Sequence, residues 1–197
     1  MKVDFVFFLN SILLGVGLAM DSFSVSVADT LNEPDMKKGK TFGIAGTFGI
    51  YQALMPMIGW VCVHTLLEYF SAFEKFIPWI ALILLLYIGG EMLVEGLRKD
   101  ETDDQAHYEL TFAKLMVQGI ATAIDALSVG FTIAEYDFPV ALLSVLIVGT
   151  ITFCISLCGC LLGKKFGHLL NNKASVLGGT ILIAIGLEIW IKGVFLK

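Results

Sequence analysis

The sequence is too apolar for an ordinary soluble protein. Of its 197 residues, 57% are hydrophobic, and the mean hydropathy is +0.83. A typical soluble domain has about 45–50% apolar residues, so the composition predicts a membrane protein with no separate soluble domain. The net charge of −5 excludes a nucleic-acid-binding function, because the chain has no basic face to neutralise phosphates.

A helix that crosses a bilayer needs about 20 apolar residues. Six stretches meet this length, at about residues 5–28, 41–64, 77–97, 112–134, 139–162 and 174–195. The first ends in small residues, as a signal peptide does, but it is too long and carries Asp21 within its apolar part. We therefore expect an all-α integral membrane protein with six transmembrane helices.

The lysine and arginine residues predict the orientation of the helices. Nine fall on one side of such a six-helix arrangement and four on the other; the first set is Lys37, Lys38, Lys40, Arg98, Lys99, Lys114, Lys164, Lys165 and Lys173, and the second is Lys2, Lys75, Lys192 and Lys197. The more basic side is expected in the cytoplasm, which places both termini outside the cell. The connection from Asp29 to Lys40 is then a cytoplasmic turn.

The fourth stretch carries a carboxylate in an otherwise apolar sequence, Gly119-Ile-Ala-Thr-Ala-Ile-Asp125-Ala-Leu-Ser128-Val-Gly130. An aspartate at the centre of a membrane helix costs about 2.5–3.5 kcal/mol on insertion scales, so it is treated as functional by default. The same pattern occurs 104 positions earlier, where Asp21 and Ser24 match Asp125 and Ser128. The alternative is that each aspartate only hydrogen-bonds the serines to hold helices together.

Two further side chains are candidate ligands. Pro56 lies in the middle of the second stretch and frees a backbone carbonyl near Gln52, which could bind a cation, although a simple packing kink explains it equally well. Glu95 has Arg98 within a helical turn, so it is either part of an interfacial ion pair or a further ligand. The acidic linker at 98–111 could concentrate divalent cations at the cytoplasmic side, or be an ordinary solvated linker.

The order of the motifs predicts a duplicated unit. The third helices match through Ile88-Gly89 and Ile185-Gly186, an offset of 97, and the second helices through Gly49 and Gly59 against Gly149 and Gly159, an offset of 100. Residues 1–97 and 112–197 are then two three-helix repeats, and an odd number of helices makes them inverted. Inverted repeats are typical of transporters, whose site lies near the membrane midplane between the repeats.

Two carboxylates with neighbouring hydroxyls and carbonyls form a site of hard oxygen ligands, which suits Mg²⁺, Mn²⁺ or Ca²⁺. One divalent cation balances both aspartates, and a proton can replace it when it leaves. Export of a divalent cation against an inside-negative potential costs about 4.6 kcal/mol per 100 mV. The chain has no phosphate-binding loop for ATP, so export would be coupled to proton entry.

The chain resembles the MntP-type manganese efflux pumps over essentially its whole length. The resemblance rests on the two aspartate motifs, on Gln52-Ala-Leu-Met-Pro56-Met-Ile-Gly59-Trp60 and on the helix end at Glu95-Gly96. It implies export of Mn²⁺ across the bacterial cell membrane, with Asp21 and Asp125 as the matching essential acids. No cofactor is expected beyond the transported ion and its proton counter-ion. Glu91 and Glu188 depart from the family pattern and are not assigned as ligands.

Two other functions remain open at this stage. A membrane thiol-redox protein would use Cys62, Cys154, Cys158 and Cys160, but its chemistry requires paired cysteines in equivalent helices, and three of these lie in one stretch. We interpret them as small packing residues. A small-solute exporter would use the same carboxylates to bind an amine.

Overall fold

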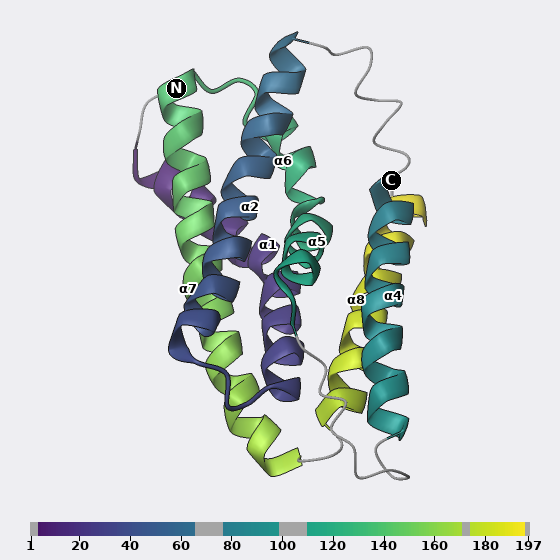
Figure 1. Ribbon diagram of the computed structural model, residues 1–197. Helices are drawn as coiled ribbons and strands as arrows, with labels where there is room; N and C mark the ends of the chain where they lie inside the picture. The colour runs from purple at the N-terminus through teal and green to yellow at the C-terminus, as the bar shows by residue number, and fades with distance from the viewer. Residues whose placement is uncertain (1–3, 66–76, 99–109, 171–173, 196–197) are drawn as a thin grey trace.

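The computed structural model describes residues 4–65, 77–98, 110–170 and 174–195, which form seven helices and no strand. The helices are α1 (Phe5–Asn32), α2 (Lys38–Thr65), α4 (Ile77–Arg98), α5 (Phe112–Ala123), α6 (Ala126–Thr132), α7 (Phe138–Leu170) and α8 (Ala174–Phe195) (Figure 1). The prediction of an all-α membrane protein is confirmed for these residues.

Within the described parts of the chain, three helices are long and apolar enough to cross a membrane. They cover Phe5–Asn32, Lys38–His64 and Phe138–Phe166, while α4 and α8 contain the shorter apolar stretches Leu85–Val94 and Val176–Glu188. The fourth predicted stretch is divided into α5 and α6. The number of spans therefore stays a prediction.

The residues that flank α1 determine where the helix begins and ends. The side chain of Asp4 accepts a hydrogen bond from the amide of Phe7 at 2.9 Å and so caps the first turn. At the other end the helix stops at Asn32, one residue before Glu33, because a residue that precedes a proline is pushed out of the helical region. The turn predicted to begin at Asp29 thus begins about one helical turn later.

Helices α1 and α7 run in the same direction, whereas α2 and α7 run in opposite directions. Early in both helices, the hydroxyls of Ser11 and Ser144 lie 3.1 Å apart, and later Gly163 packs against the backbone of Val27. Helix α2 instead pairs Phe42 with Phe153 and its later residue Trp60 with Phe138, at ring-centroid distances of 6.3 and 5.9 Å. Helices α4 and α8 form a separate antiparallel pair beside this group (Figure 1).

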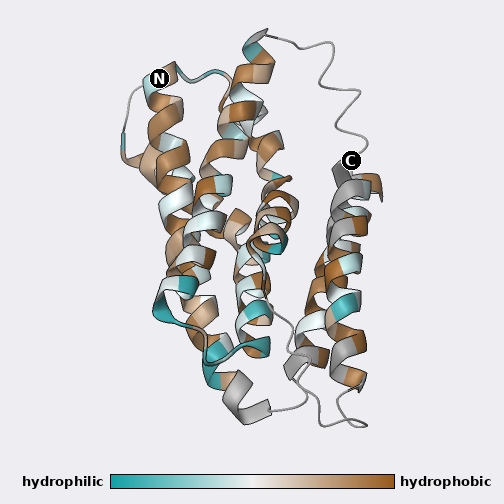
Figure 2. Cartoon of the chain, viewed as in Figure 1, coloured by the Kyte–Doolittle hydropathy of each residue, from teal (hydrophilic) through white to brown (hydrophobic). Residues whose placement is uncertain are grey.

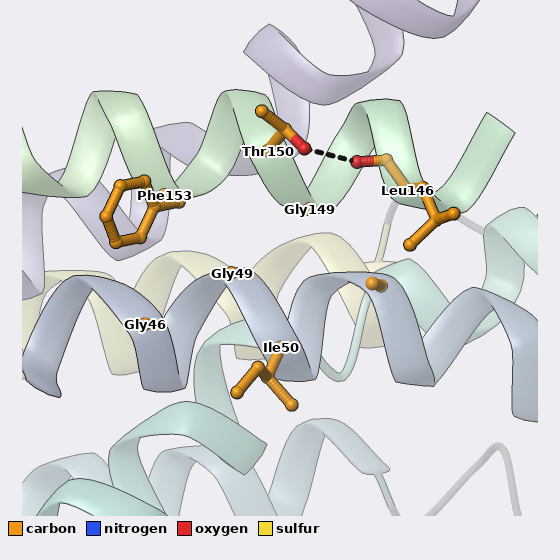
Figure 3. A pocket seen from close by; sticks show the side chains of 8 residues that line it. Gly46, Gly49, Ile50, Leu146, Gly149, Thr150 and Phe153 are labelled. Atoms are coloured by element: carbon orange, nitrogen blue, oxygen red, sulfur yellow. Dashed lines mark hydrogen bonds between the residues drawn. The ribbon is translucent and has the colours of Figure 1, made fainter. Parts of the chain in front are cut away.

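Glycines allow close contacts between α2 and α7. A Cβ atom on Gly49 would lie 2.8 Å from the carbonyl oxygen of Gly149, and one on Gly149 would lie 2.7 Å from that of Gly49. A shallow groove follows this contact, lined by Gly46, Gly49, Ile50, Ala53, Leu146, Gly149, Thr150 and Phe153 (Figure 3). Close backbone approach of this kind is typical of helix packing in membranes.

The exterior of the described helices is more apolar than that of a soluble protein, although most buried residues are apolar as well. Large apolar side chains point outward, such as Phe5, which is 79% exposed, and Leu13, which is 61% exposed. Hydrophilic residues gather at the connection between α1 and α2, and most residues of the coloured helices are apolar or intermediate in hydropathy (Figure 2). Many buried side chains are polar; among them are Ser11, Ser22, Ser26, Asp29, Gln52, Gln118, Thr152 and Ser156. An apolar exterior of this extent marks a surface that contacts lipid.

Candidate metal site

The helix that carries Asp125 is broken at that residue. Helix α5 ends at Ala123, Ile124 and Asp125 form a turn, and α6 starts at Ala126. The carboxylate oxygen Oδ1 of Asp125 accepts a hydrogen bond from the amide of Ala126 at 2.8 Å. The prediction of one continuous helix over 112–134 is therefore wrong, because an aspartate side chain can take over a backbone amide and start a new helix there.

Asp21 has a different backbone setting. Helix α1 runs unbroken through it, and its side chain is half-buried, whereas Asp125 is exposed on the isolated chain. Irregular backbone is tolerated at membrane depth only where it is buried in protein or lines a water-filled cavity. Of the two matching acids, Asp125 is therefore the one that lies at an interruption of the helical backbone.

The two serines lie beside their aspartates but make different contacts. The hydroxyl of Ser24 donates to the carbonyl of Met20 at 3.0 Å, one turn earlier in α1. Ser128 is exposed, and its amide donates to the carbonyl of Asp125 at 3.0 Å. Ser24 and Asp21 are three residues apart on a continuous helix and share a face, as their spacing predicts.

Gln52 is the predicted ligand whose surroundings fit the role best. It is fully buried on α2, and its amide nitrogen Nε2 donates to the carbonyl of Leu18 at 3.4 Å, one turn before Asp21. Its oxygen Oε1 has no hydrogen-bond donor among the described residues. A buried amide oxygen without a donor is costly, and it has the chemistry of a ligand for a hard cation.

Helix α2 contacts both aspartate motifs. Gln52 reaches α1 near Asp21, and two turns later Gly59 packs against the backbone of Leu127 in α6, two residues after Asp125. The helix is continuous through Pro56, which has no amide to donate to the carbonyl of Gln52. Helix α2 thus carries Gln52 and contacts α1 one turn before Asp21 and α6 two residues after Asp125.

Two predicted features lie outside the described parts of the chain. Glu95 belongs to α4, but its side chain is not described, and the acidic linker is not described over 99–109. Within the described residues, no group of three or more His, Cys, Asp or Glu side chains is placed to hold a metal ion. A cation site built on Asp21 or Asp125 would therefore need amide, hydroxyl or backbone oxygens as further ligands, which suits a hard divalent ion.

The structure describes the surroundings of Glu91 and of the four cysteines. Glu91, which was not assigned as a ligand, forms an ion pair with Lys114 at 2.7 Å, and this pair connects α4 to α5. All four cysteines are free thiols, and Cys154, Cys158 and Cys160 lie on α7 while Cys62 lies on α2. The described structure contains no disulfide to support the thiol-redox alternative.

Sequence analysis missed a buried carboxylate at Asp29. It lies in the last turns of α1 with no exposed surface, and the side-chain nitrogen of Gln118 on α5 donates to its oxygen Oδ1 at 2.9 Å. A signal was present, because Ser22, Ser26 and Asp29 recur at the spacing of one helix face. Because Asp29 was assigned to a turn, its position on this helix face was not recognised.

The apolar helices and the family that the chain matches together define a membrane transporter rather than an enzyme. A family model described as "Putative manganese efflux pump" matches residues 35–190. The chain belongs to this family, the MntP family, which confirms the resemblance found in the sequence.

Individual relatives agree with the family model. A protein named "Putative manganese efflux pump MntP" from Ruminiclostridium cellulolyticum is 38% identical over 93% of this chain and 95% of its own length. Proteins with the same name from Methanosarcina mazei and Methanothermobacter thermautotrophicus are 41% and 40% identical, over 92% and 94% of this chain and 95% and 97% of their own lengths. No solved structure matches the chain.

Proposed function

We propose that this protein exports Mn²⁺ from the cytoplasm in exchange for protons, through a midplane site built on Asp21 and Asp125. The observation that carries the proposal is the break of the helix at Asp125, in a chain whose relatives are named as manganese efflux pumps. Discontinuous helices in transporters place backbone ends and acidic side chains at the ion site.

The ligands that we assign to Mn²⁺ are all oxygen atoms. They are the carboxylates of Asp21 and Asp125, the free oxygen Oε1 of Gln52, and the hydroxyls of Ser24 and Ser128. Glu95 remains a candidate at the end of α4. Because one divalent ion balances two carboxylates, its departure leaves two uncompensated charges out of water, and entering protons neutralise them.

The site lies between two inverted repeats, residues 1–97 and 112–197, in our interpretation. Two glycine contacts support this arrangement: Gly59 packs on the carbonyl oxygen of Leu127, and a Cβ on Gly159 would lie 2.7 Å from that of Phe23. Gly59 and Gly159 are equivalent by the offset of 100, and Phe23 and Leu127 by the offset of 104. The same contact thus occurs once in each direction, as a two-fold relation requires.

The orientation completes the proposal. With both termini outside, the connection between α1 and α2 faces the cytoplasm of a cell membrane, where the basic side of the chain is expected. Mn²⁺ would enter from that side and leave on the other. Since the membrane potential opposes this direction at about 4.6 kcal/mol per 100 mV for a divalent ion, proton entry supplies the driving force.

Mn²⁺ binding to the purified protein tests the site. Free aqueous Mn²⁺ gives a sharp EPR signal that broadens when the ion is bound, so titration measures the affinity. We expect Asp21→Asn and Asp125→Asn each to weaken binding at least about tenfold, a loss of about 1.4 kcal/mol. The control is Glu135→Gln, which removes an exposed carboxylate in the connection between α6 and α7.

Three results would contradict the proposed site. Unchanged affinity in both aspartate variants would assign the two acids to helix packing. An equal loss in Glu135→Gln would indicate attraction by surface charge alone. Competition by organic amines, with none by divalent cations, would favour the small-solute exporter.

A further inference from the structure

Asp29 is the buried carboxylate that the proposed metal site does not use. It has no exposed surface, and its oxygen Oδ1 accepts one hydrogen bond, from the neutral side chain of Gln118. Its other oxygen, Oδ2, has no partner among the described residues, and neither has the oxygen Oε1 of Gln118. A carboxylate anion taken out of water needs a cation or several donors, and this one has a single neutral donor.

The charged groups around Asp29 are engaged elsewhere. Lys40 at the start of α2 pairs with Glu33, the residue that follows α1. On α7, Lys164 donates to the backbone carbonyl of Met36 at 2.7 Å, and Cys160 is a buried free thiol close to Asp29. On α5, Lys114 pairs with Glu91 of α4. The described structure therefore provides no ion-pair partner for Asp29.

Two buried hydroxyls share a face of α1 with Asp29. Ser26 and Ser22 lie one and two turns earlier, and the hydroxyl of Ser22 has no hydrogen-bond partner among the described residues, whereas that of Ser26 lies beside the thiol of Cys160. Ser22 is adjacent to Asp21 in the chain. The parallel register of α1 and α7, set by the contacts of Gly15 with Ile151 and of Ser26 with Gly159, places the unpartnered hydroxyl of Ser156 level with Ser22.

The space around Asp29 favours a proton over a metal ion. The carboxylate is completely enclosed, and divalent ions of this class take about six or more oxygen ligands. A proton needs no such space. One hydrogen on Oδ2 would both neutralise the carboxylate and give the donor that the surrounding unpartnered oxygens lack.

We propose that Asp29 is the inner proton-binding carboxyl of this transporter, coupled electrostatically to the metal site at Asp21. The inference rests on the proposed exchange of Mn²⁺ for protons. Asp29 holds a proton when the metal site is empty and releases it to the cytoplasm when Mn²⁺ binds. Mn²⁺ at Asp21, two helical turns away, favours the charged form of Asp29, so metal binding promotes proton release and the linkage is reciprocal.

The test separates metal movement from proton coupling. In proteoliposomes, exchange of radioactive Mn²⁺ for unlabelled Mn²⁺ without a pH gradient needs only the metal site, whereas accumulation driven by a pH gradient needs both sites. Asp29→Asn retains the shape of the side chain and can still accept the hydrogen bond from Gln118. We expect it to retain Mn²⁺ affinity and exchange, but to lose gradient-driven accumulation at least about tenfold. Asp29→Glu retains a carboxyl and is expected to restore part of it.

Two results in this assay would overturn the proposal. If Asp29→Asn accumulates Mn²⁺ as the wild type does, Asp29 carries no proton of the cycle. If it loses affinity and exchange together while it remains folded by thermal melting, Asp29 belongs to the metal site. If it does not fold, Gln118→Leu gives the decision, because loss of the described hydrogen-bond donor to Asp29 is expected to change gradient-driven accumulation but not exchange.

Infrared spectroscopy gives a readout that does not depend on transport. A protonated carboxylic acid has a carbonyl stretch that is distinct from that of a carboxylate. We expect the metal-free wild type at neutral pH to show this band, and Asp29→Asn to show a weaker one, because protonated Asp21 and Asp125 still contribute to it. Absence of the band from the wild type, or a band of unchanged intensity in the variant, would refute a proton on Asp29. Failure of the wild type to couple Mn²⁺ to protons would instead refute the proposed function.

Discussion

Asp125 determines both the local chemistry and the local backbone of its motif. Its carboxylate accepts a hydrogen bond from the backbone amide of Ala126 at 2.8 Å, and the helix is interrupted at Asp125. Retaining such a side chain in a membrane helix costs about 2.5–3.5 kcal/mol, so a hydrogen bond to one amide compensates only part of the cost. In our account a bound cation compensates the rest.

At the residue scale, Gln52→Leu separates ligand loss from structural damage. The substitution removes the unpartnered oxygen Oε1 and the hydrogen bond to Leu18, but leaves an apolar side chain of similar size in a buried position. We expect Mn²⁺ affinity to fall about 10–100-fold, the range for groups that orient or complete a metal site, with little change in melting temperature.

The matched control for Gln52→Leu is Ile50→Leu, an exposed apolar residue on the same helix. It is expected to leave both affinity and melting temperature unchanged. Wild-type affinity in Gln52→Leu would remove Gln52 from the site, and the Mn²⁺ titration by EPR measures this directly.

At the element scale, contacts without side chains fix how α2 lies against α6 and how α1 lies against α7. Gly59 packs directly on the backbone of Leu127, and a Cβ on Gly159 would lie 2.7 Å from the carbonyl oxygen of Phe23. The atoms nearest to a Cβ on Gly59 all belong to the backbone, so no flexible side chain can absorb added volume at the contact of α2 with α6. The position of the Asp125 motif is therefore sensitive to the surface of α2.

Gly59→Ala tests this dependence. The added methyl group overlaps the carbonyl of Leu127 and forces α6 away from α2, with a cost of about 1–3 kcal/mol for overpacking. We expect a lower melting temperature and weaker Mn²⁺ binding than in the wild type.

Gly43→Ala is the control on the same helix, because a Cβ there has no atom within 4 Å. An alanine in that open position is expected to be neutral or slightly stabilising, since alanine favours the helix by about 1 kcal/mol over glycine. Equal effects of the two substitutions would contradict the role of the α2–α6 contact.

At the scale of the whole molecule, the described connections can be assigned to opposite sides of the membrane. We replace the four native cysteines with serine and introduce Asp35→Cys or Glu135→Cys, both at exposed positions. A membrane-impermeant maleimide should label the first only in inside-out vesicles and the second only in intact cells. Labelling of both from one side would contradict the proposed orientation.

The sequence was sufficient to predict the helical membrane class, because apolar composition and helix length determine it directly. Small residues at helix spacing in the second and fifth stretches favour close packing, and the structure has such a contact between Gly49 and Gly149. The sequence could not predict the break at Asp125, because the matching motif at Asp21 lies on a continuous helix. The difference depends on what α2 and α6 place around each acid, and local sequence does not contain that information.

The burial of Asp29 was missed for a related reason. Four residues beyond it, Glu33, Pro34 and Asp35 favour a turn, and sequence patterns locate helix ends only to within a few residues. Burial arises from Gln118, which is 89 positions away in the chain. Long-range pairing of this kind becomes visible only in the folded protein.

The most direct test of the account is simultaneous measurement of Mn²⁺ flux and internal pH in vesicles of defined orientation under an imposed proton gradient. The account predicts that the wild type moves Mn²⁺ against its gradient while protons move the opposite way, and that Asp125→Asn does neither. Mn²⁺ flux that is absent from the wild type, or unchanged in Asp125→Asn, would contradict the paired-carboxylate site and leave the two aspartates as contacts that hold helices together.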